Sequence, residues 1–477
     1  MSHTTPAAIP FWQAFRFWLK LGFISFGGPA GQIAIMHSEL VDKRRWLSEA
    51  RFLHALNYCM VLPGPEAQQL ATYIGWLMHR TVGGVVAGVL FVLPSLLLLI
   101  GLSWVYMAYG STPWVAGVFY GIKPAVVAIV AHAAHRLGGK VLKNRWLWGI
   151  AVAAFVALFF LQVPFPYIVL AAACVGFFGA KVAPSAFGSP ATAATATHAN
   201  KSSQASQSLA PVVLDDHTPT PAHALFAWRT CALVLALGAA LWALPLGALN
   251  AAYGWAHTYT QMAWFFTKAA LLTFGGAYAV LPYVVQGAVN QYQWLTPTQM
   301  VDGLALGEST PGPLIIIVAF VGFVGGYGLQ PKGSFAAGAI AACIVTWFTF
   351  LPSFIFILAG GPFVESTRSK LGFTAPLTAI SAAVTGVIVN LALFFAYHVF
   401  WPRGLAEFAA LNGASGLGGL GGWGAFAGFG QQVWSSIDKP AVAIFIAAAV
   451  ALFVFKRSVL QVLAGAAVLG LMVGWWA

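Results

Sequence analysis

Two kinds of glycine–proline break interrupt apolar segments near the start of the chain, and both recur later at a constant spacing. The matched pairs are Lys20 and Lys268, Phe26-Gly27-Gly28 and Phe274-Gly275-Gly276, Trp46-Leu47 and Trp294-Leu295, and Pro63-Gly64-Pro65 and Pro311-Gly312-Pro313. The offset is the same throughout (268 − 20 = 248; 311 − 63 = 248), so the two copies align here without a gap. This pattern predicts an internal duplication built on broken apolar helices.

The duplication continues with a shifted offset. Leu93-Pro94-Ser95 matches Leu351-Pro352-Ser353, and Ala125-Val126 matches Ala383-Val384 (352 − 94 = 258; 383 − 125 = 258), which indicates an insertion near residues 330–334. Between the copies lies a stretch rich in Ala, Ser, Thr and Pro without apolar periodicity, as disordered linkers have. The predicted parts are a first repeat (1–183), a disordered linker (184–225), a connecting helix and loop (226–257) and a second repeat (258–477).

The composition places these segments in a lipid bilayer. The chain is 60% hydrophobic and only 7% charged, where about 25% charged residues is usual for soluble proteins. We therefore predict an all-α polytopic membrane protein with about 13 apolar segments. These segments are 11–36, 50–79, 82–110, 113–136, 146–162, 164–181, 226–248, 258–288, 298–327, 334–360, 374–399, 440–455 and 458–476. The first residues do not have the pattern of a removable signal peptide. A glycine-rich insert around 416–424 is expected to form a surface loop.

The distribution of charge predicts that the two repeats are inverted. The loop at 37–51 carries Lys43, Arg44, Arg45 and Arg51, whereas the matching loop at 291–298 has no Lys or Arg. The positive-inside rule then places the first loop in the cytoplasm and the second outside. The single unmatched segment at 226–248 would produce this inversion.

A second basic loop, at 136–145, adds a constraint on the broken segments. Three apolar segments separate it from the loop at 37–51, which would put the two basic loops on opposite sides if all three segments crossed the bilayer. One segment should therefore turn back, and the segments with Pro63-Gly64-Pro65 and Gly27-Gly28-Pro29 are the natural candidates for re-entrant helices. Thirteen full crossings are the alternative.

Breaks at membrane depth usually line a cavity, because the freed backbone groups need partners. Close packing of helices through small residues is the alternative explanation. Glycine lets the backbone approach a ligand, and a half-helix that begins at a break directs N–H groups and partial positive charge towards it. An oxyanion suits such a site. The candidate binding residues are Gly27, Gly28, Pro29, Pro63, Gly64, Pro65, Gly275, Gly276, Pro311, Gly312 and Pro313, with Gln68, Gln69, Ser309 and Thr310 as nearby hydrogen-bond donors.

Three lysines lie within apolar segments, where insertion of a cation costs roughly 2.5–3.5 kcal/mol. Lys20 and Lys268 occupy matching positions, which favours a role in a shared site, and Lys123 precedes Pro124. Snorkelling of the ammonium groups to the interface is the alternative for each of them.

Two glutamates adjoin the Pro-Gly-Pro breaks. Glu66 follows the first break and Glu308 precedes the second. A carboxylate beside an anion site repels the anion unless it is protonated, so both are candidates for coupling proton movement to anion movement. For Glu66, favourable placement in a first helical turn is the alternative. Asp302 is assigned to the membrane interface.

Other chemistry is weakly indicated. Cys59, Cys174, Cys231 and Cys343 show no C-x-x-C spacing, so neither a disulfide framework nor a zinc site is predicted. His132 and His135 lie at i, i+3 but lack carboxylate or thiolate partners, which favours a contact between helices over a metal site. Ser309 has no strand–turn–helix context, so an intramembrane hydrolase is disfavoured. No cofactor or metal is predicted. No nucleic-acid partner is predicted either, because the residues that give the net charge of +12 sit in short loops between apolar segments.

The paired motifs resemble those of the chromate ion transporter family in its long, two-domain form. The resemblance rests on Phe26-Gly27-Gly28-Pro29 and Pro63-Gly64-Pro65-Glu66-Ala67 with their second copies. It implies a bacterial inner-membrane protein that expels chromate, a tetrahedral dianion similar to sulfate, and so confers chromate resistance. The second copy has Ala277 in place of Pro29 and Leu314 in place of Glu66, which makes the first copy the better candidate for the anion site.

These inferences combine into one functional prediction. The chain is expected to be a secondary transporter that moves a chromate-like oxyanion outward across the bilayer by exchange with protons. Transport of mainly sulfate or another oxyanion stays open. A sensor without flux and an intramembrane enzyme are alternatives from other classes. The oligomeric state is not determined by the sequence, and a homodimer is compatible with it.

Overall fold

The computed structural model describes residues 9–26, 28–182, 213–214, 221–274, 276–329, 333–366, 374–402 and 437–476. Within these ranges the chain is helical, and its only β-type pairing is an isolated bridge between Leu47 and Leu214. The elements are α1 (Phe11–Ile24), α2 (Gly28–His37), η1 (Ser38–Lys43), α3 (Glu49–Val61), α4 (Glu66–Tyr109), α5 (Pro113–Val141), α6 (Arg145–Phe159), α7 (Phe165–Val182), η2 (Ala222–Ala224), α10 (Trp228–Tyr253), α11 (Thr258–Leu271), α12 (Ala277–Val285), η3 (Gln286–Gln291), α13 (Pro297–Ser309), η4 (Leu314–Ile316), α14 (Ile317–Tyr327), α15 (Phe335–Ser366), α16 (Thr374–Phe400), α19 (Lys439–Phe453) and α20 (Val459–Trp476).

The helices and their apolar outer faces confirm an all-α membrane protein. Among the described residues, six helices are long and apolar enough to span a bilayer: α4, α5, α7, α10, α15 and α16. Large apolar side chains remain exposed on their outer faces. In the most apolar stretch of α10, only 11% of the residues are buried. An apolar exterior of this extent suits lipid rather than water.

The segments that contain the breaks do not form single long helices. In the first copy they give α1, α2 and α3, with 14, 10 and 13 residues, and the part of α4 that precedes its bend at His79. In the second copy they give α11, α12, α13 and α14, with 14, 9, 13 and 11 residues. A spanning helix needs about 20 residues, so none of these helices is long enough to cross the bilayer.

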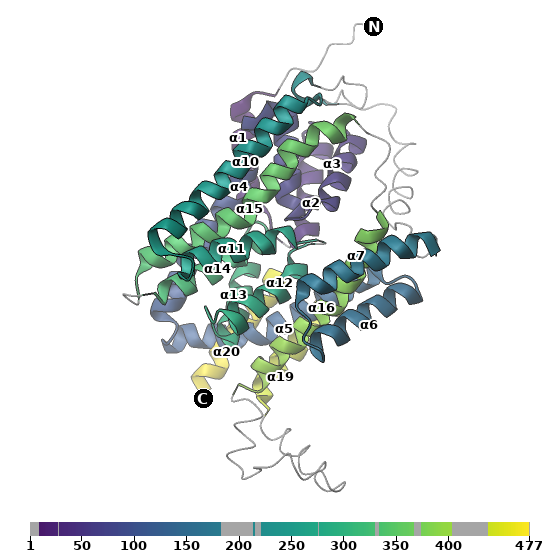
Figure 1. Cartoon of the computed structure of the whole chain (residues 1–477). Coiled ribbons are helices and arrows are strands. Elements are labelled where there is room, and N and C mark those ends of the chain that lie inside the picture. Colours follow the sequence, from purple (N-terminus) through teal and green to yellow (C-terminus); the bar gives the residue numbers. More distant parts are fainter. Residues whose placement is uncertain are drawn as a thin grey trace.

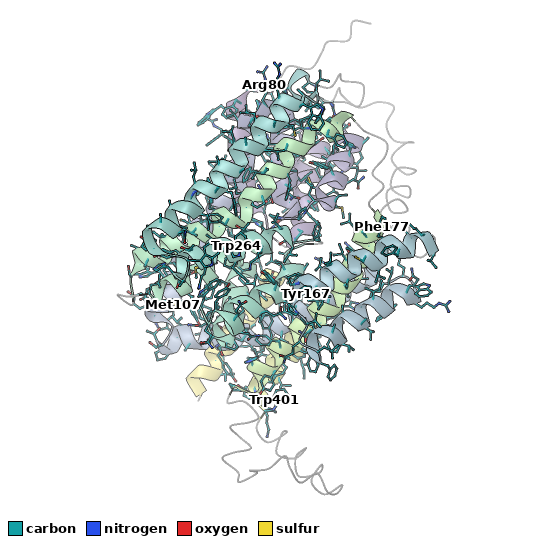
Figure 2. All side chains as sticks on the ribbon, in the orientation of Figure 1. Arg80, Met107, Tyr167, Phe177, Trp264 and Trp401 are labelled. Atoms are coloured by element: carbon teal, nitrogen blue, oxygen red, sulfur yellow. The ribbon has the colours of Figure 1, made fainter. Side chains whose placement is uncertain are left out.

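The start of α1 and the bend within α4 lie at the same end of the molecule. Helix α4 bends at His79 and Arg80, which have non-helical backbone angles, and its two halves pack closely enough that a Cβ on Gly75 would lie 2.5 Å from the Gly83 oxygen. His79 Nε2 lies 2.8 Å from the Ile9 oxygen. The N-terminal end of α1 therefore lies beside this bend. Figure 2 shows Arg80 at one end of the molecule and Trp401 at the other.

The second copy makes corresponding contacts. Helix α14 packs against α15, where a Cβ on Gly322 would lie 2.8 Å from the Ala341 oxygen. The Tyr259 hydroxyl at the start of α11 donates to the Ala337 oxygen near the start of α15, at 3.1 Å. The start of α11 therefore lies beside the turn that joins α14 to α15, as the start of α1 lies beside the bend in α4.

Further contacts recur at the sequence offset. The rings of Phe17 and Trp46 lie 5.1 Å apart, and those of Phe265 and Trp294 lie 5.6 Å apart (265 − 17 = 248; 294 − 46 = 248). In both copies, the residue two positions after the tryptophan caps the following helix. The Ser48 hydroxyl accepts from the Arg51 amide at the start of α3, and the Thr296 hydroxyl accepts from the Gln299 amide at the start of α13, each satisfying an otherwise unpaired N–H.

The remaining helices pack across the two halves of the chain. Helix α5 packs against α19 and α20, whereas α16 packs against α6 and α7. Figure 1 shows these six helices in the lower part of the molecule, with α1, α4, α10 and α15 above them. Glycines permit the closest approaches: a Cβ on Gly121 would lie 2.0 Å from the Ala466 oxygen, and one on Gly386 would lie 2.0 Å from the Ala151 oxygen.

The described part of the predicted linker is attached to the first copy. The Leu214 amide donates to the Trp46 oxygen at 3.1 Å, and His223 Nε2 lies 3.0 Å from the Trp76 oxygen. Residues 183–212 and 215–220, and the glycine-rich insert around 416–424, lie outside the described residues.

Replacement of Gly386 by alanine tests the contact between α16 and α6. The new methyl group would meet the Ala151 oxygen at 2.0 Å, and overpacking of this kind costs about 1–3 kcal/mol. We expect a lower apparent Tm in detergent, measured by fluorescence-detected size-exclusion chromatography after heating. Gly149→Ala is the matched control, because a Cβ there meets nothing within 4 Å and alanine favours the helix. Equal Tm values for the two variants would contradict the packing described.

Candidate functional site

The four breaks meet through reciprocal hydrogen bonds between the two copies. The Gly64 amide donates to the Thr273 oxygen at 2.7 Å, and the Gly312 amide donates to the Ser25 oxygen at 2.7 Å. The two bonds are related by the sequence offset (273 − 25 = 248; 312 − 64 = 248). Each Pro-Gly-Pro break therefore binds the residue that precedes the Phe-Gly-Gly break of the other copy.

We call the place where the four breaks meet the crossing. Two serines from the long helices α4 and α15 also make contacts there. The Ser95 hydroxyl of α4 donates to the Pro311 oxygen at 2.5 Å. Gln69 Nε2 donates to the Pro63 oxygen at 2.7 Å and lies 3.4 Å from the Ser353 hydroxyl of α15. Ser95 and Ser353 are repeat-matched (353 − 95 = 258). Ser95 of α4 contacts the second-copy break at Pro311, and Ser353 of α15 lies beside Gly64 of the first-copy break.

Glycine is required at the centre of both Pro-Gly-Pro breaks. Gly64 has φ +127° and Gly312 has φ +97°, a region that side chains with a Cβ rarely adopt. A Cβ would also lie 2.4 Å from the Ser353 hydroxyl at Gly64 and 1.8 Å from the Ser95 hydroxyl at Gly312. The breaks thus depend on glycine both for conformation and for space.

The Phe-Gly-Gly breaks lie next to each other. A Cβ on Gly276 would lie 3.9 Å from Pro29 Cγ, while Gly27 and Gly275 are outside the described residues. Gln32 of α2 joins them to the crossing by donating to the Gly312 oxygen, with the Ser25 oxygen 3.4 Å away. Four helices begin at these breaks: α2, α12, α4 and η4.

Several buried polar groups around the crossing have no hydrogen-bond partner within the described part of the chain. They are the Ser25 hydroxyl and the side-chain oxygens of Gln32, Gln68 and Gln69, and all four residues are at most 1% exposed. The amide of Gln68 is used, since Nε2 donates to the Thr72 hydroxyl at 3.0 Å. Unsatisfied buried groups are rare in folded proteins, so this cluster fits a position where water or a ligand binds.

The two glutamates adjoin the two Pro-Gly-Pro breaks, and each interacts electrostatically with a cation of α5. Glu66 is the first residue of α4, and Lys140 is close enough to interact with it electrostatically. Glu308 is 7% exposed. It accepts a hydrogen bond from the Tyr278 hydroxyl and interacts electrostatically with Arg136. Arg136 and Lys140 are both exposed residues of α5.

The matched lysines have other neighbours. Lys20 is exposed and acts electrostatically on Glu39 of η1. A hydrogen bond from Lys43 is the main reason that the pKa of Glu39 lies below its ordinary value, with Lys20 making a smaller contribution. Lys268 Nζ lies 5.8 Å from the Trp264 ring centre. No hydrogen bond or ion pair joins either lysine to the break residues that the structure describes.

The remaining candidates make mostly local contacts. The Ser309 hydroxyl donates to the Leu306 oxygen at 2.9 Å, and the Thr310 hydroxyl donates to the Gly307 oxygen at 3.0 Å. His132 and His135 both pack on the Phe453 ring. Pro65 and Pro313 are the residues immediately before α4 and η4.

Ser25, Thr273, Ser95, Ser353 and Gln32 are site residues that the sequence reasoning did not assign. A signal for four of them was present, because Ser25 and Thr273 precede the Phe-Gly-Gly motifs at offset 248 and the two Leu-Pro-Ser motifs match at offset 258. Paired hydroxyl residues beside duplicated breaks would have identified them. Gln32 is matched by Val280 and had no such signal.

The fold and this centre define a multi-pass helical membrane protein in which broken helices meet in the interior, an arrangement typical of secondary transporters. The particular family follows from comparison with known proteins. The sequence profile of the chromate transporter family matches residues 12–177 and 260–471, and the chain belongs to this family.

Individual relatives agree with this assignment. A chromate transport protein of Pseudomonas aeruginosa is 33% identical over 394 residues, which cover 81% of each chain. A chromate transport protein of Cupriavidus metallidurans is 30% identical over 400 residues, or 83% of this chain and 84% of the relative. An uncharacterized transporter of Bacillus subtilis is 30% identical over 148 residues, which are 75% of its length but only 30% of this chain. No solved structure matches the chain.

Replacement of Gly312 by alanine tests the crossing. The substitution combines a positive φ with a contact of 1.8 Å to Ser95, and the conformational part alone costs about 1–2 kcal/mol. We expect a lower apparent Tm in detergent than for Gly28→Ala, which also has a positive φ of +70° but no atom within 4 Å of the new Cβ. If both variants lost the same stability, the close contact with Ser95 would be wrong.

Proposed function

We propose that this protein is a secondary transporter for chromate or a closely similar oxyanion such as sulfate, in the inner membrane of a bacterium. The observation that carries the proposal is the reciprocal pairing of Gly64 with Thr273 and of Gly312 with Ser25. It brings the first residues of four half-helices into one place, as in transporters whose substrate sites lie between discontinuous helices. The names of the relatives supply the substrate.

An anion is the ligand that this centre suits. Helix N-termini favour negative charge through their free N–H groups and dipoles, and the unpaired Ser25 hydroxyl is a further donor. The amides of Gly64 and Gly312 are not available, because they bond to the opposite copy. The anion would instead be bound by the first turns of the half-helices, and Gly27, Gly28, Pro29, Gly275 and Gly276 stay in the proposed site.

The cations and carboxylates around the centre suggest how transport is coupled. Arg136 and Lys140 would attract a dianion towards the breaks, whereas ionised Glu66 and Glu308 would repel it. Protonation of the glutamates removes that repulsion, so proton and anion movements become linked, and an exchange that drives chromate outward would confer resistance. The relatives are named as transport proteins, and we propose a transporter rather than an enzyme. Net flux separates transport from an oxyanion sensor.

We further propose that residues 1–183 and 258–477 are inverted repeats. Contacts recur at offsets 248 and 258, and the hydrogen bonds at the centre are reciprocal, which supports a pseudo-twofold relation. The basic residues of the loop at 37–51 support a cytoplasmic position for that loop. In this arrangement the broken segments are re-entrant from opposite sides.

Chromate uptake into everted membrane vesicles tests the function and its coupling. We expect labelled chromate to accumulate when a proton gradient is present, sulfate to compete, and the rate in Glu66→Gln to equal the rate without a gradient because the titrating group is gone. Glu49→Gln, which removes a partly buried carboxylate at the start of α3, is the control. Binding without accumulation would contradict transport, and an intact gradient dependence in Glu66→Gln would contradict coupling by this residue.

Side-specific labelling tests the inverted topology. Lys43 and Gln291 are repeat-matched (291 − 43 = 248) and both are exposed. In a background lacking the four native cysteines, we expect Lys43→Cys to react with a membrane-impermeant maleimide from the cytoplasmic side and Gln291→Cys to react from the outer side. Reaction of both from the cytoplasm would refute inversion.

A further inference from the structure

The two matched hairpins differ in how deeply they are buried. Eight of the nine residues of α12 are buried, but only Gln32 and Met36 are buried among the ten of α2. The second-copy hairpin (α12, η3 and α13) shares one hydrophobic core with α5, α16 and α20. The first-copy hairpin (α2, η1 and α3) belongs to a separate core with α1 and the start of α4. The second-copy hairpin therefore packs against α5, α16 and α20, which we call the α5 group. The first-copy hairpin does not share that core.

An ion pair between a partly buried lysine and a buried aspartate joins the second-copy hairpin to α5. Lys123 Nζ of α5 lies 3.4 Å from Asp302 Oδ2 of α13, and the Tyr106 hydroxyl at the end of α4 donates to the same oxygen at 2.8 Å. Asp302 is only 1% exposed, and its other oxygen has no partner in the described part of the chain. Loss of the Lys123 charge would leave the buried Asp302 carboxylate uncompensated in a low-dielectric interior, which is strongly unfavourable.

The pair is not repeated at the matching positions. These are His54 in the first copy for Asp302, and Ser381 and Val364 in the second copy for Lys123 and Tyr106 (302 − 54 = 248; 381 − 123 = 258; 364 − 106 = 258). The first-copy hairpin uses a different contact: Arg51 Nη2 of α3 lies 3.7 Å from Glu365 Oε2 of α15. It is thus tied to the helices around α4 and α15, not to the α5 group. The charges differ between copies where the hairpin positions differ.

We propose that Lys123, Asp302 and Tyr106 form a latch that holds the second-copy hairpin closed against α5, and that opening this latch is the step that exposes the site to the opposite side of the membrane. The proposal rests on the proposed transport function. These are positioning residues, because no half-helix terminus at the breaks includes them. The ion pair would break when the hairpin moves away and re-form when it returns.

The reaction rate of a buried cysteine measures whether the latch holds. Ala288 of η3 is 0% exposed and matches Leu40 of η1, which is also 0% exposed. In the full-length protein without its native cysteines, we expect Ala288→Cys to react with N-ethylmaleimide at least about tenfold faster when Asp302→Asn or Lys123→Met is added, as loss of a hydrogen bond to a charged group implies. Lys143→Met, which removes an exposed cation beyond the end of α5, should leave the rate unchanged.

Exchange of the two charges separates the latch from a general loss of structure. The double variant Lys123→Asp with Asp302→Lys should restore the slow reaction at Ala288→Cys, while neither single variant does. If the single variants fail to fold, Tyr106→Phe removes only the hydroxyl and should still accelerate the reaction. Unchanged rates in the variants that fold, or a double variant no slower than the single ones, would overturn the proposal. No anion is needed for this measurement, so absence of chromate flux would refute the function and leave the latch.

Discussion

A helix that stops within a bilayer must find partners for the backbone groups that it frees, and this chain meets that requirement between its two halves. The Gly64 amide bonds to the Thr273 carbonyl, and the Gly312 amide bonds to the Ser25 carbonyl. Each half therefore lacks a partner that only the other half supplies. A single copy would have to take these partners from a second chain, so duplication in one chain makes the pairing permanent.

The outer helices extend the same dependence. Helix α5 packs on α19 and α20, and α16 packs on α6 and α7, so each half closes its packing with helices of the other. Gly121 and Gly386 allow the backbones to approach where side chains would separate them. Small residues at close crossings are the usual means of helix association in membranes, where lipid is as apolar as the side chains. The centre is thereby held between two interlocked halves.

The sequence predicted the helical membrane fold and the family because composition and duplicated breaks report on them directly. Its offsets also relate residues that make equivalent contacts, such as Ser95 and Ser353. Hydrogen-bond partners were not predictable, because an offset says which residues are equivalent but not which ones touch. Lys20 and Lys268 illustrate this: they match in sequence, yet one lies near Glu39 and the other over Trp264.

The sequence could not predict the difference in burial between the two hairpins, for a related reason. Duplicated sequences predict equivalent environments, but the two hairpins differ in burial and therefore do not make the same contacts. Single charges without a match in the other copy carry this information: Asp302 opposite His54, and Glu66 opposite Leu314. Asp302 pairs with α5 in the more buried hairpin, whereas Glu66 lies at the break that follows the less buried hairpin. The unmatched charges thus distinguish the more buried hairpin from the less buried one.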